Sequence, residues 1–172
     1  MSSQSSRGAQ ASAPASAPAS AAAGAVSPMN DTAVLHRLRT FLLWLAALLS
    51  AGALVELWAA EHTEEPLQWV PFILCGLSLI AIAAALLRPQ RGVLLALRGV
   101  MLLMVLGSLL GIYEHVAGNI AFAQEIRPNT AGFDLLLEGL TGANPLLAPG
   151  MLAVAALIAL AATYYHPALM RR

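Results

Sequence analysis

The sequence has no lysine, a single cysteine and few charged residues, and each shortage excludes a class of protein. Charged residues make up 10% of the 172-residue chain, whereas a soluble domain typically has about 25%. Nine arginines balance nine acidic residues and form no dense patch, which argues against nucleic-acid binding. The lone cysteine, Cys75, excludes an internal disulfide framework.

Motifs of known catalytic chemistry are missing as well. The sequence has no glycine-rich phosphate loop, no nucleophile elbow and no paired Cys or His metal motif. We therefore predict that the protein is not an enzyme and that it needs no cofactor. The lack of lysine and the abundance of alanine indicate a GC-rich coding sequence and hence a bacterial source.

Long apolar runs are what the chain does have. Hydrophobic residues make up 59% of it, and they are concentrated in segments of about 20 residues, the length that a bilayer core requires. We predict membrane spans at 41–60, 67–87, 95–116 and 145–165. The fold class that follows is all-α: a polytopic membrane protein, built as a four-transmembrane-helix up-down bundle.

The N-terminal segment has a different composition. Alanine, serine and proline dominate residues 1–30, and such a segment buries too little apolar surface to offset the entropy of ordering it. We predict a disordered cytoplasmic tail over 1–33, followed by a membrane domain over 34–172. An organellar transit peptide is the alternative, because the first 30 residues contain no acid.

The arginines predict how the chain is oriented. They lie before the first span, after the second and after the fourth: Arg37, Arg39, Arg88, Arg91, Arg171 and Arg172. Because cytoplasmic loops collect basic residues, we place both termini inside and the connections 61–66 and 117–144 outside. We predict that the protein lies in the bacterial inner (plasma) membrane.

The outer connection and the start of the third span each leave two alternatives. Residues 133–140 mix apolar and acidic positions and predict a short amphipathic helix, which either lies on the outer membrane surface or caps the bundle. The third span begins at Gly92 or at Gly99. In either case we expect Arg98 to lie at the lipid edge and to extend its side chain to the membrane boundary.

Glycines mark the predicted packing faces of the first and third spans. At 100° per residue, three glycines of the third span share one helix face with Glu114, and two of them form a small-xxx-small pair. On the first span a glycine precedes Glu56 by one turn. The predicted packing residues are Gly52, Gly107, Gly111 and Gly118.

The polar residues on these faces form a candidate cluster in the outer half of the bundle. Its members are Glu56, Glu114, His115, Asn119 and Glu125. Carboxylate and imidazole groups together can relay protons or bind a divalent metal ion. The structural alternative is that the acids only reach the headgroup region and that His115 and Asn119 hydrogen-bond neighbouring helices.

The function predicted from these features is that of an accessory or structural subunit that packs against other membrane proteins. Small residues on the fourth span, Ala155, Ala159 and Ala162, are expected to contribute to that packing. The alternative is a small ion- or proton-handling or metal-binding membrane protein that uses the outer Glu/His cluster. The expected partners are the lipid bilayer and either a membrane-protein partner or further copies of the chain.

Overall fold

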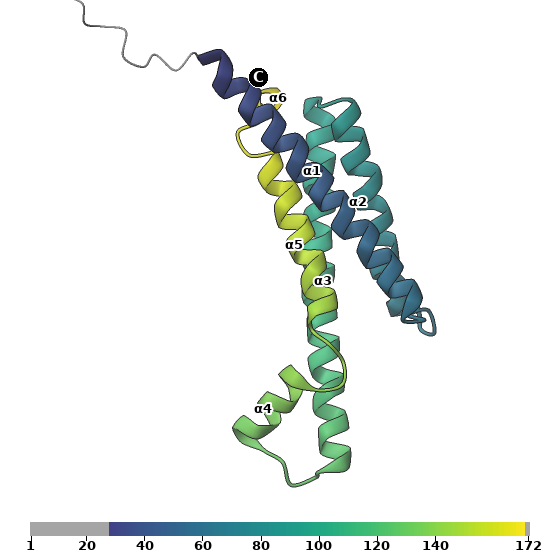
Figure 1. Ribbon diagram of the computed structural model, residues 1–172. Helices are drawn as coiled ribbons and strands as arrows, with labels where there is room; N and C mark the ends of the chain where they lie inside the picture. Colours follow the sequence, from purple (N-terminus) through teal and green to yellow (C-terminus); the bar gives the residue numbers. More distant parts are fainter. Residues whose placement is uncertain (1–27, 171–172) are drawn as a thin grey trace, which may run out of the picture.

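Every regular element in the described part of the chain, residues 28–170, is a helix. The computed structural model describes residues 28–170, with side chains from residue 31 onward. The elements are α1 (Pro28–Ala59), the 3₁₀ helix η1 (Pro66–Gln68), α2 (Trp69–Leu87), α3 (Arg91–Ile126), α4 (Gly132–Thr141), α5 (Leu147–Ala162) and α6 (Pro167–Met170), as Figure 1 shows. The predicted all-α class is confirmed.

Three segments are long and apolar enough to cross a membrane. They run over residues 31–59, 66–87 and 91–126, and α5 is a shorter apolar helix of 16 residues. At 1.5 Å per residue α5 is about 24 Å long, a few ångströms short of a hydrocarbon core of about 30 Å. The fold is thus three long apolar helices with a fourth, shorter one packed beside them.

The predicted tail over 1–33 falls mainly on residues 1–27, which lie outside the described residues. Its last six residues are helical, because α1 begins at Pro28. Proline suits the first position of a helix, where its missing N–H would have no partner in any case. Asp31 follows in the first turn, where a negative charge is favourable next to the positive end of the helix dipole.

The shorter helix α5 lies between α1 and α3. It packs against α1 on one side and α3 on the other, while α2 also bridges α1 and α3. Small side chains permit this close approach, and four alanines of α5 are almost completely buried: Ala155, Ala156, Ala159 and Ala162. A cluster that joins Glu56 to Glu114 would need α1 and α3 to be direct neighbours, but α5 and α2 lie between these two helices.

Burial of the α5 alanines also changes their predicted role. They contact α1 and α3 of the same chain, so they are not available for packing against another protein. Two buried hydroxyl contacts add specificity inside the bundle. Ser50 of α1 and Ser78 of α2 lie 3.0 Å apart between their Oγ atoms, and Ser108 of α3 donates to the Pro149 carbonyl of α5 at 2.5 Å.

Helix α3 is much longer than the predicted third span. It has 36 residues, or about 54 Å at 1.5 Å per residue, and it continues through residues 117–126, which the sequence assigned to a loop. In Figure 1 its last third leaves the bundle and carries α4 beside it. We call residues 112–141, which comprise this end of α3, the turn and α4, the hairpin.

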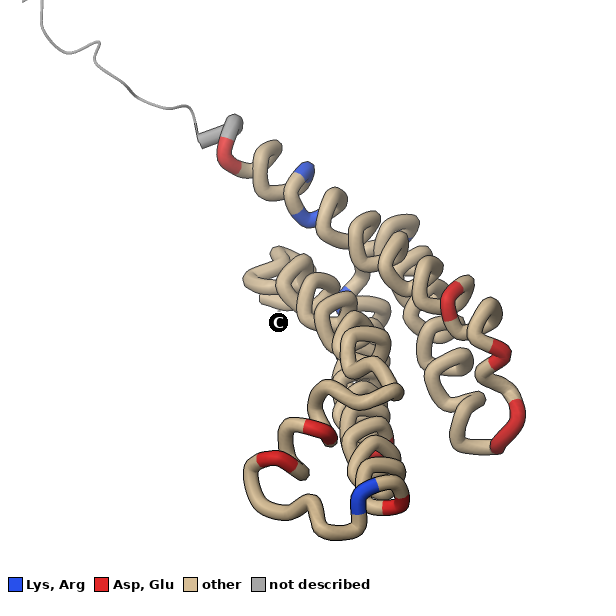
Figure 2. Tube along the Cα trace, turned by 60° about the horizontal axis from the view of Figure 1, so that its bottom comes forward, with Lys and Arg blue, Asp and Glu red and all other residues tan. Residues whose placement is uncertain are grey.

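Charge divides the molecule into two ends, as Figure 2 shows. Eight of the nine acidic residues belong to what we call the acidic end, which comprises the last turn of α1, the α1–α2 turn and the hairpin: Glu56, Glu61, Glu64, Glu65, Glu114, Glu125, Asp134 and Glu138. Five arginines belong to the opposite, basic end, in the first half of α1, at the α2–α3 connection and early in α3: Arg37, Arg39, Arg88, Arg91 and Arg98. The α1–α2 turn and α3 meet at the acidic end, where the rings of His62 and His115 lie 6.5 Å apart.

Candidate functional site

A glycine allows the two helices of the hairpin to pack closely. Gly139 of α4 sits directly over α3, where an added Cβ would lie 2.9 Å from Cγ1 of Ile120 and 3.3 Å from Cγ1 of Val116. A larger side chain at this position would push α4 away from α3. The sequence therefore needs glycine here for the close approach of the two helices.

Asn119 joins the hairpin to the segment that enters α5. Its side-chain Nδ2 donates to the carbonyls of Gly139 and Asn144, both at 3.0 Å, and its Oδ1 accepts from the Asn144 amide at 2.8 Å. The residue is 2% exposed, so these bonds replace water that the amide has lost. Asn119 thus has a structural role, which agrees with the alternative that it hydrogen-bonds neighbouring parts of the bundle.

His115 makes a similar contact one turn earlier. Its Nδ1 lies 2.8 Å from the Pro145 carbonyl. Because a carbonyl oxygen only accepts, Nδ1 carries the proton and donates in this bond. Asn119 and His115 therefore both hold the chain just before α5 begins.

The three glutamates of the predicted cluster are not buried in the bundle. Glu56, Glu114 and Glu125 are all exposed, so the inward orientation expected for Glu114 is wrong. Helical periodicity does place Glu114 near the glycine face, but α5 begins only at Leu147. Beyond that level α3 is covered by the chain around 139–145, which contacts His115 and Asn119 instead.

The glycines of α3 contact three different neighbours. A Cβ at Gly107 would collide with Leu74 of α2; one at Gly111 would lie 3.1 Å from Cβ of Pro149, and one at Gly118 would lie 3.0 Å from Nδ2 of Asn144. These three glycines therefore pack against other parts of the same chain. Gly52 differs, because no atom lies within 4 Å of an added Cβ there, and the residue makes no close helix contact in this chain.

At the basic end, two arginines bind the end of α5. Arg98 of α3 donates from Nε to Oγ1 of Thr163 at 2.8 Å and from Nη2 to the Thr163 carbonyl at 3.0 Å. Arg39 of α1 donates from Nη2 to the carbonyls of Tyr164 and Tyr165, at 3.3 and 3.1 Å. These carbonyls follow the last helical residue, Ala162, at the negative end of the helix dipole, where guanidinium groups are favourable.

Arg98 therefore does not occupy the lipid-edge position expected from the sequence. It is half-buried against α5, because Thr163 lies opposite it at the level where α5 ends. Helix periodicity supplies the direction of a side chain from its own helix axis, but it carries no information on where another helix ends. Arg39 also supports a turn in which Tyr165 has a positive φ of 47°, a conformation that costs about 1–2 kcal/mol for a residue other than glycine.

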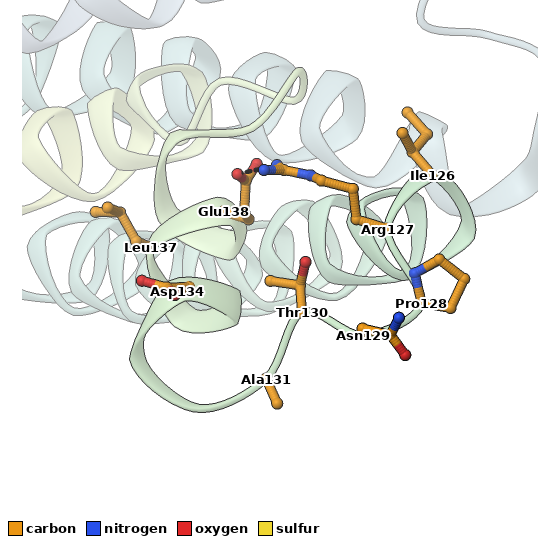
Figure 3. A pocket seen from close by; sticks show the side chains of 9 residues that line it. All are labelled: Ile126, Arg127, Pro128, Asn129, Thr130, Ala131, Asp134, Leu137 and Glu138. Atoms are coloured by element: carbon orange, nitrogen blue, oxygen red, sulfur yellow. Dashed lines mark hydrogen bonds and ion pairs between the residues drawn. The ribbon is translucent and has the colours of Figure 1, made fainter.

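Helix α4 has an exposed apolar face, and two large apolar side chains of α3 are exposed as well. The face of α4 is formed by Phe133, Leu136, Leu137 and Leu140, and the exposed residues of α3 are Phe122 and Ile126. Beside them an open pocket of about 780 Å³ lies at the turn between α3 and α4. Figure 3 shows Arg127 reaching across this pocket to Glu138, with which it forms an ion pair, while Asp134 lies on the same wall.

The interior has no candidate for ion transfer or metal binding within residues 31–170. The buried polar side chains there are Ser50, Ser78, Ser108, Asn119 and Thr163, none of them acidic, and none of their buried atoms is without a hydrogen bond. No group of three or more His, Cys, Asp or Glu side chains in this part of the chain is placed to hold a metal ion. The metal-binding alternative thus gains no support from the geometry.

Comparisons of the chain with protein families, with curated proteins and with solved structures give no match. The function is therefore inferred from the residues and their arrangement. Two sites stand out: the apolar, acid-rimmed hairpin and the arginine-bound end of α5. Only part of the first was expected from the sequence, and the second was not expected at all.

Proposed function

We propose that the chain is a non-enzymatic accessory subunit of the bacterial inner membrane, which crosses the bilayer four times and offers its hairpin to a membrane-protein partner. The charge distribution supports the orientation, since arginines favour the cytoplasmic side. With the basic end inside, the acidic end and the hairpin lie outside (Figure 2). Helix α5 is the fourth span; its few missing ångströms can be accommodated by local thinning of the bilayer.

Exposed aromatic residues support the same placement. Trp58, Trp69 and Tyr113 lie toward the acidic end, and Tyr164 and Tyr165 lie at the basic end. Tryptophan and tyrosine favour the two interfaces of a bilayer. If Tyr113 marks the outer interface, the 13 residues that follow it in α3, up to Ile126, extend about 20 Å beyond the membrane.

The observation that carries the accessory role is the apolar face of this hairpin. Lipid cannot cover it if it stands outside the bilayer, and an exposed apolar face on a protein marks an interaction site. Its rim is acidic, with Glu125 and Asp134 both exposed. A second copy of the chain would bring two acidic rims together, so we assign the face to a partner with apolar and basic side chains.

The ion-handling alternative has weaker support. A proton or ion path through a bundle requires polar or ionisable groups in its interior, and the buried polar groups of residues 31–170 are neutral and mutually satisfied. Glu56 and Glu114 remain exposed at one end. The accessory role is therefore the function that the geometry supports better.

A photo-crosslinking amino acid at Leu136, in the full chain in its native membrane, tests this role. We expect one protein adduct of defined mass, which Asp134→Arg removes because the introduced positive charge cancels that of Glu125 and repels a basic partner. The matched control is the same probe at Leu102, an equally exposed position on the membrane part of α3, where we expect no such adduct.

Three outcomes contradict the proposal. An adduct of twice the chain mass would assign the face to a second copy. Labelling of lipid alone would place α4 on the membrane surface. An adduct that survives Asp134→Arg would show that the acidic rim does not select the partner.

A further inference from the structure

The arginine-bound end of α5 encloses a small cavity. It has a volume of about 50 Å³ and lies where α1, α2, α3 and the end of α5 meet. A single water occupies roughly 10–15 Å³ measured in this way, so the space is that of about four waters. A phosphate group, with five non-hydrogen atoms, is of this size.

One wall of the cavity is polar and basic. It is formed by His36, Arg39 and Thr40 of α1 together with Thr163 and His166 after α5. Both hydrogen bonds of Arg39 to backbone carbonyls use Nη2, and Nε and Nη1 have no bond to the described residues. The guanidinium thus keeps donors for a ligand.

His166 has a defined tautomer beside this wall. Its Nδ1 accepts from the Ala168 amide at 3.2 Å, so a neutral ring carries its proton on Nε2 and can donate there. Burial lowers the pKa of His166, and the positive charges of Arg39 and His36 lower it further. An anion would relieve this repulsion.

The remaining lining of the cavity is mainly apolar. Leu43 of α1, Ala85 of α2 and Leu94 of α3 contribute to it, and all three are buried. The cavity therefore combines basic and apolar lining residues, and the proposed orientation places it near the inner headgroup region. A lipid phosphate meets both kinds of environment where the headgroup joins the acyl chains.

We propose that this cavity binds a phosphate group through Arg39, His36 and His166. The phosphate belongs either to an anionic membrane lipid or to free inorganic phosphate, since both offer the same acceptor oxygens. Guanidinium groups bind phosphate through charge-assisted hydrogen bonds, and basic pockets between membrane helices on the cytoplasmic side suit anionic headgroups. The inference rests on the proposed membrane location for the lipid source.

Native mass spectrometry of the full chain in detergent tests the site with three probes. These are phosphatidylglycerol, a neutral glycolipid with the same acyl chains, and inorganic phosphate. We expect phosphatidylglycerol or inorganic phosphate to be retained by the wild type, and Arg39→Gln to weaken that retention about tenfold or more, because a hydrogen bond to a charged group is lost.

Two further variants keep the test independent of folding. His36→Gln changes an exposed wall residue and is expected to weaken retention in the same direction without loosening α5. The matched control is Arg37→Gln, which removes the same charge from α1 two residues away, outside the cavity. It is expected to leave retention unchanged.

The outcomes separate the sources and the possible failures. Retention of phosphatidylglycerol alone identifies a lipid site, and retention of inorganic phosphate alone identifies a site for the free anion. Equal retention of all three probes, or equal effects of Arg39→Gln and Arg37→Gln, overturns the site. If carbonate washing releases the chain from membranes without detergent, the proposed membrane function fails instead, and the inorganic phosphate result still decides the cavity.

Discussion

The two ends of the bundle hold helix α5 with different chemistry. At the basic end, the guanidinium groups of Arg39 and Arg98 bind the carbonyls of residues 163–165. At the acidic end, the amide of Asn119 and the imidazole of His115 bind the chain before α5. The difference shows that arginines of the basic end also hydrogen-bond the chain at the end of α5, whereas Glu56, Glu114 and Glu125 at the other end are exposed and hold no helix end.

The largest expected effect comes from breaking the acidic-end contacts. Asn119→Ala leaves two carbonyls and one amide without their partner, and each unsatisfied buried group costs about 1–3 kcal/mol. We expect the free energy of opening the hairpin to fall by about 3 kcal/mol, and amide hydrogen exchange at Asn144 to become faster. Asn129→Ala, at an exposed position in the turn, is the control, and equal exchange in both variants would contradict the structural role of Asn119.

Breaking the basic end is expected to cost somewhat less. Arg98→Gln removes two charge-assisted bonds to Thr163, worth about 1.5–3 kcal/mol in total because Arg98 is only half-buried. Thermal unfolding in detergent should show a lower midpoint than for Arg88→Gln, which removes an exposed arginine at the same end. Identical midpoints would show that the arginines serve topology alone.

A smaller effect is expected from pH at the basic end. The pKa of His166 lies below its usual value in the folded chain because of burial and the nearby Arg39 and His36. The unfolded state therefore binds protons first as the pH falls, so stability is lost as the pH drops below the ordinary histidine pKa of about 6.5. His166→Gln should flatten this part of the stability profile; an unchanged profile would contradict the electrostatic account.

The smallest effect is expected for the exposed acids at the other end. Glu56→Gln and Glu114→Gln, singly and together, should change stability by no more than about 0.5 kcal/mol, the usual range for surface substitutions. Proton and metal flux in proteoliposomes should equal that of empty vesicles for the wild type and for all three variants. Flux that is present in the wild type and lost in the double variant would restore the ion-handling alternative.

Much of the fold could be predicted from hydropathy, because an apolar run of about 20 residues has few stable alternatives to a helix. The length of α3 could not, since the sequence becomes more polar after Tyr113 and predicts a span that ends at 116. A helix ends where hydrogen bonding or backbone geometry forbids it, and the first such residue is Pro128, whose preceding residue disfavours helical geometry. Helix α3 does end just before it, at Ile126.

The candidate site was predictable only in its local part. Spacing placed His115 and Asn119 on neighbouring turns of one helix, and both contact the chain that enters α5. Their partners lie 20 to 30 residues further along the chain, and no local pattern reveals such pairs. The same holds for Arg98 and Thr163, which are 65 residues apart.

Cysteine accessibility tests the central claim most directly, that the acidic end lies outside and the basic end inside. In a Cys75→Ala background, single cysteines are placed at His62, Gln90 and Asn129 and treated with an impermeant maleimide on intact spheroplasts. The account predicts labelling at positions 62 and 129 and, at position 90, labelling only after the membrane is opened. Labelling of positions 62 and 90 from the same side would contradict it.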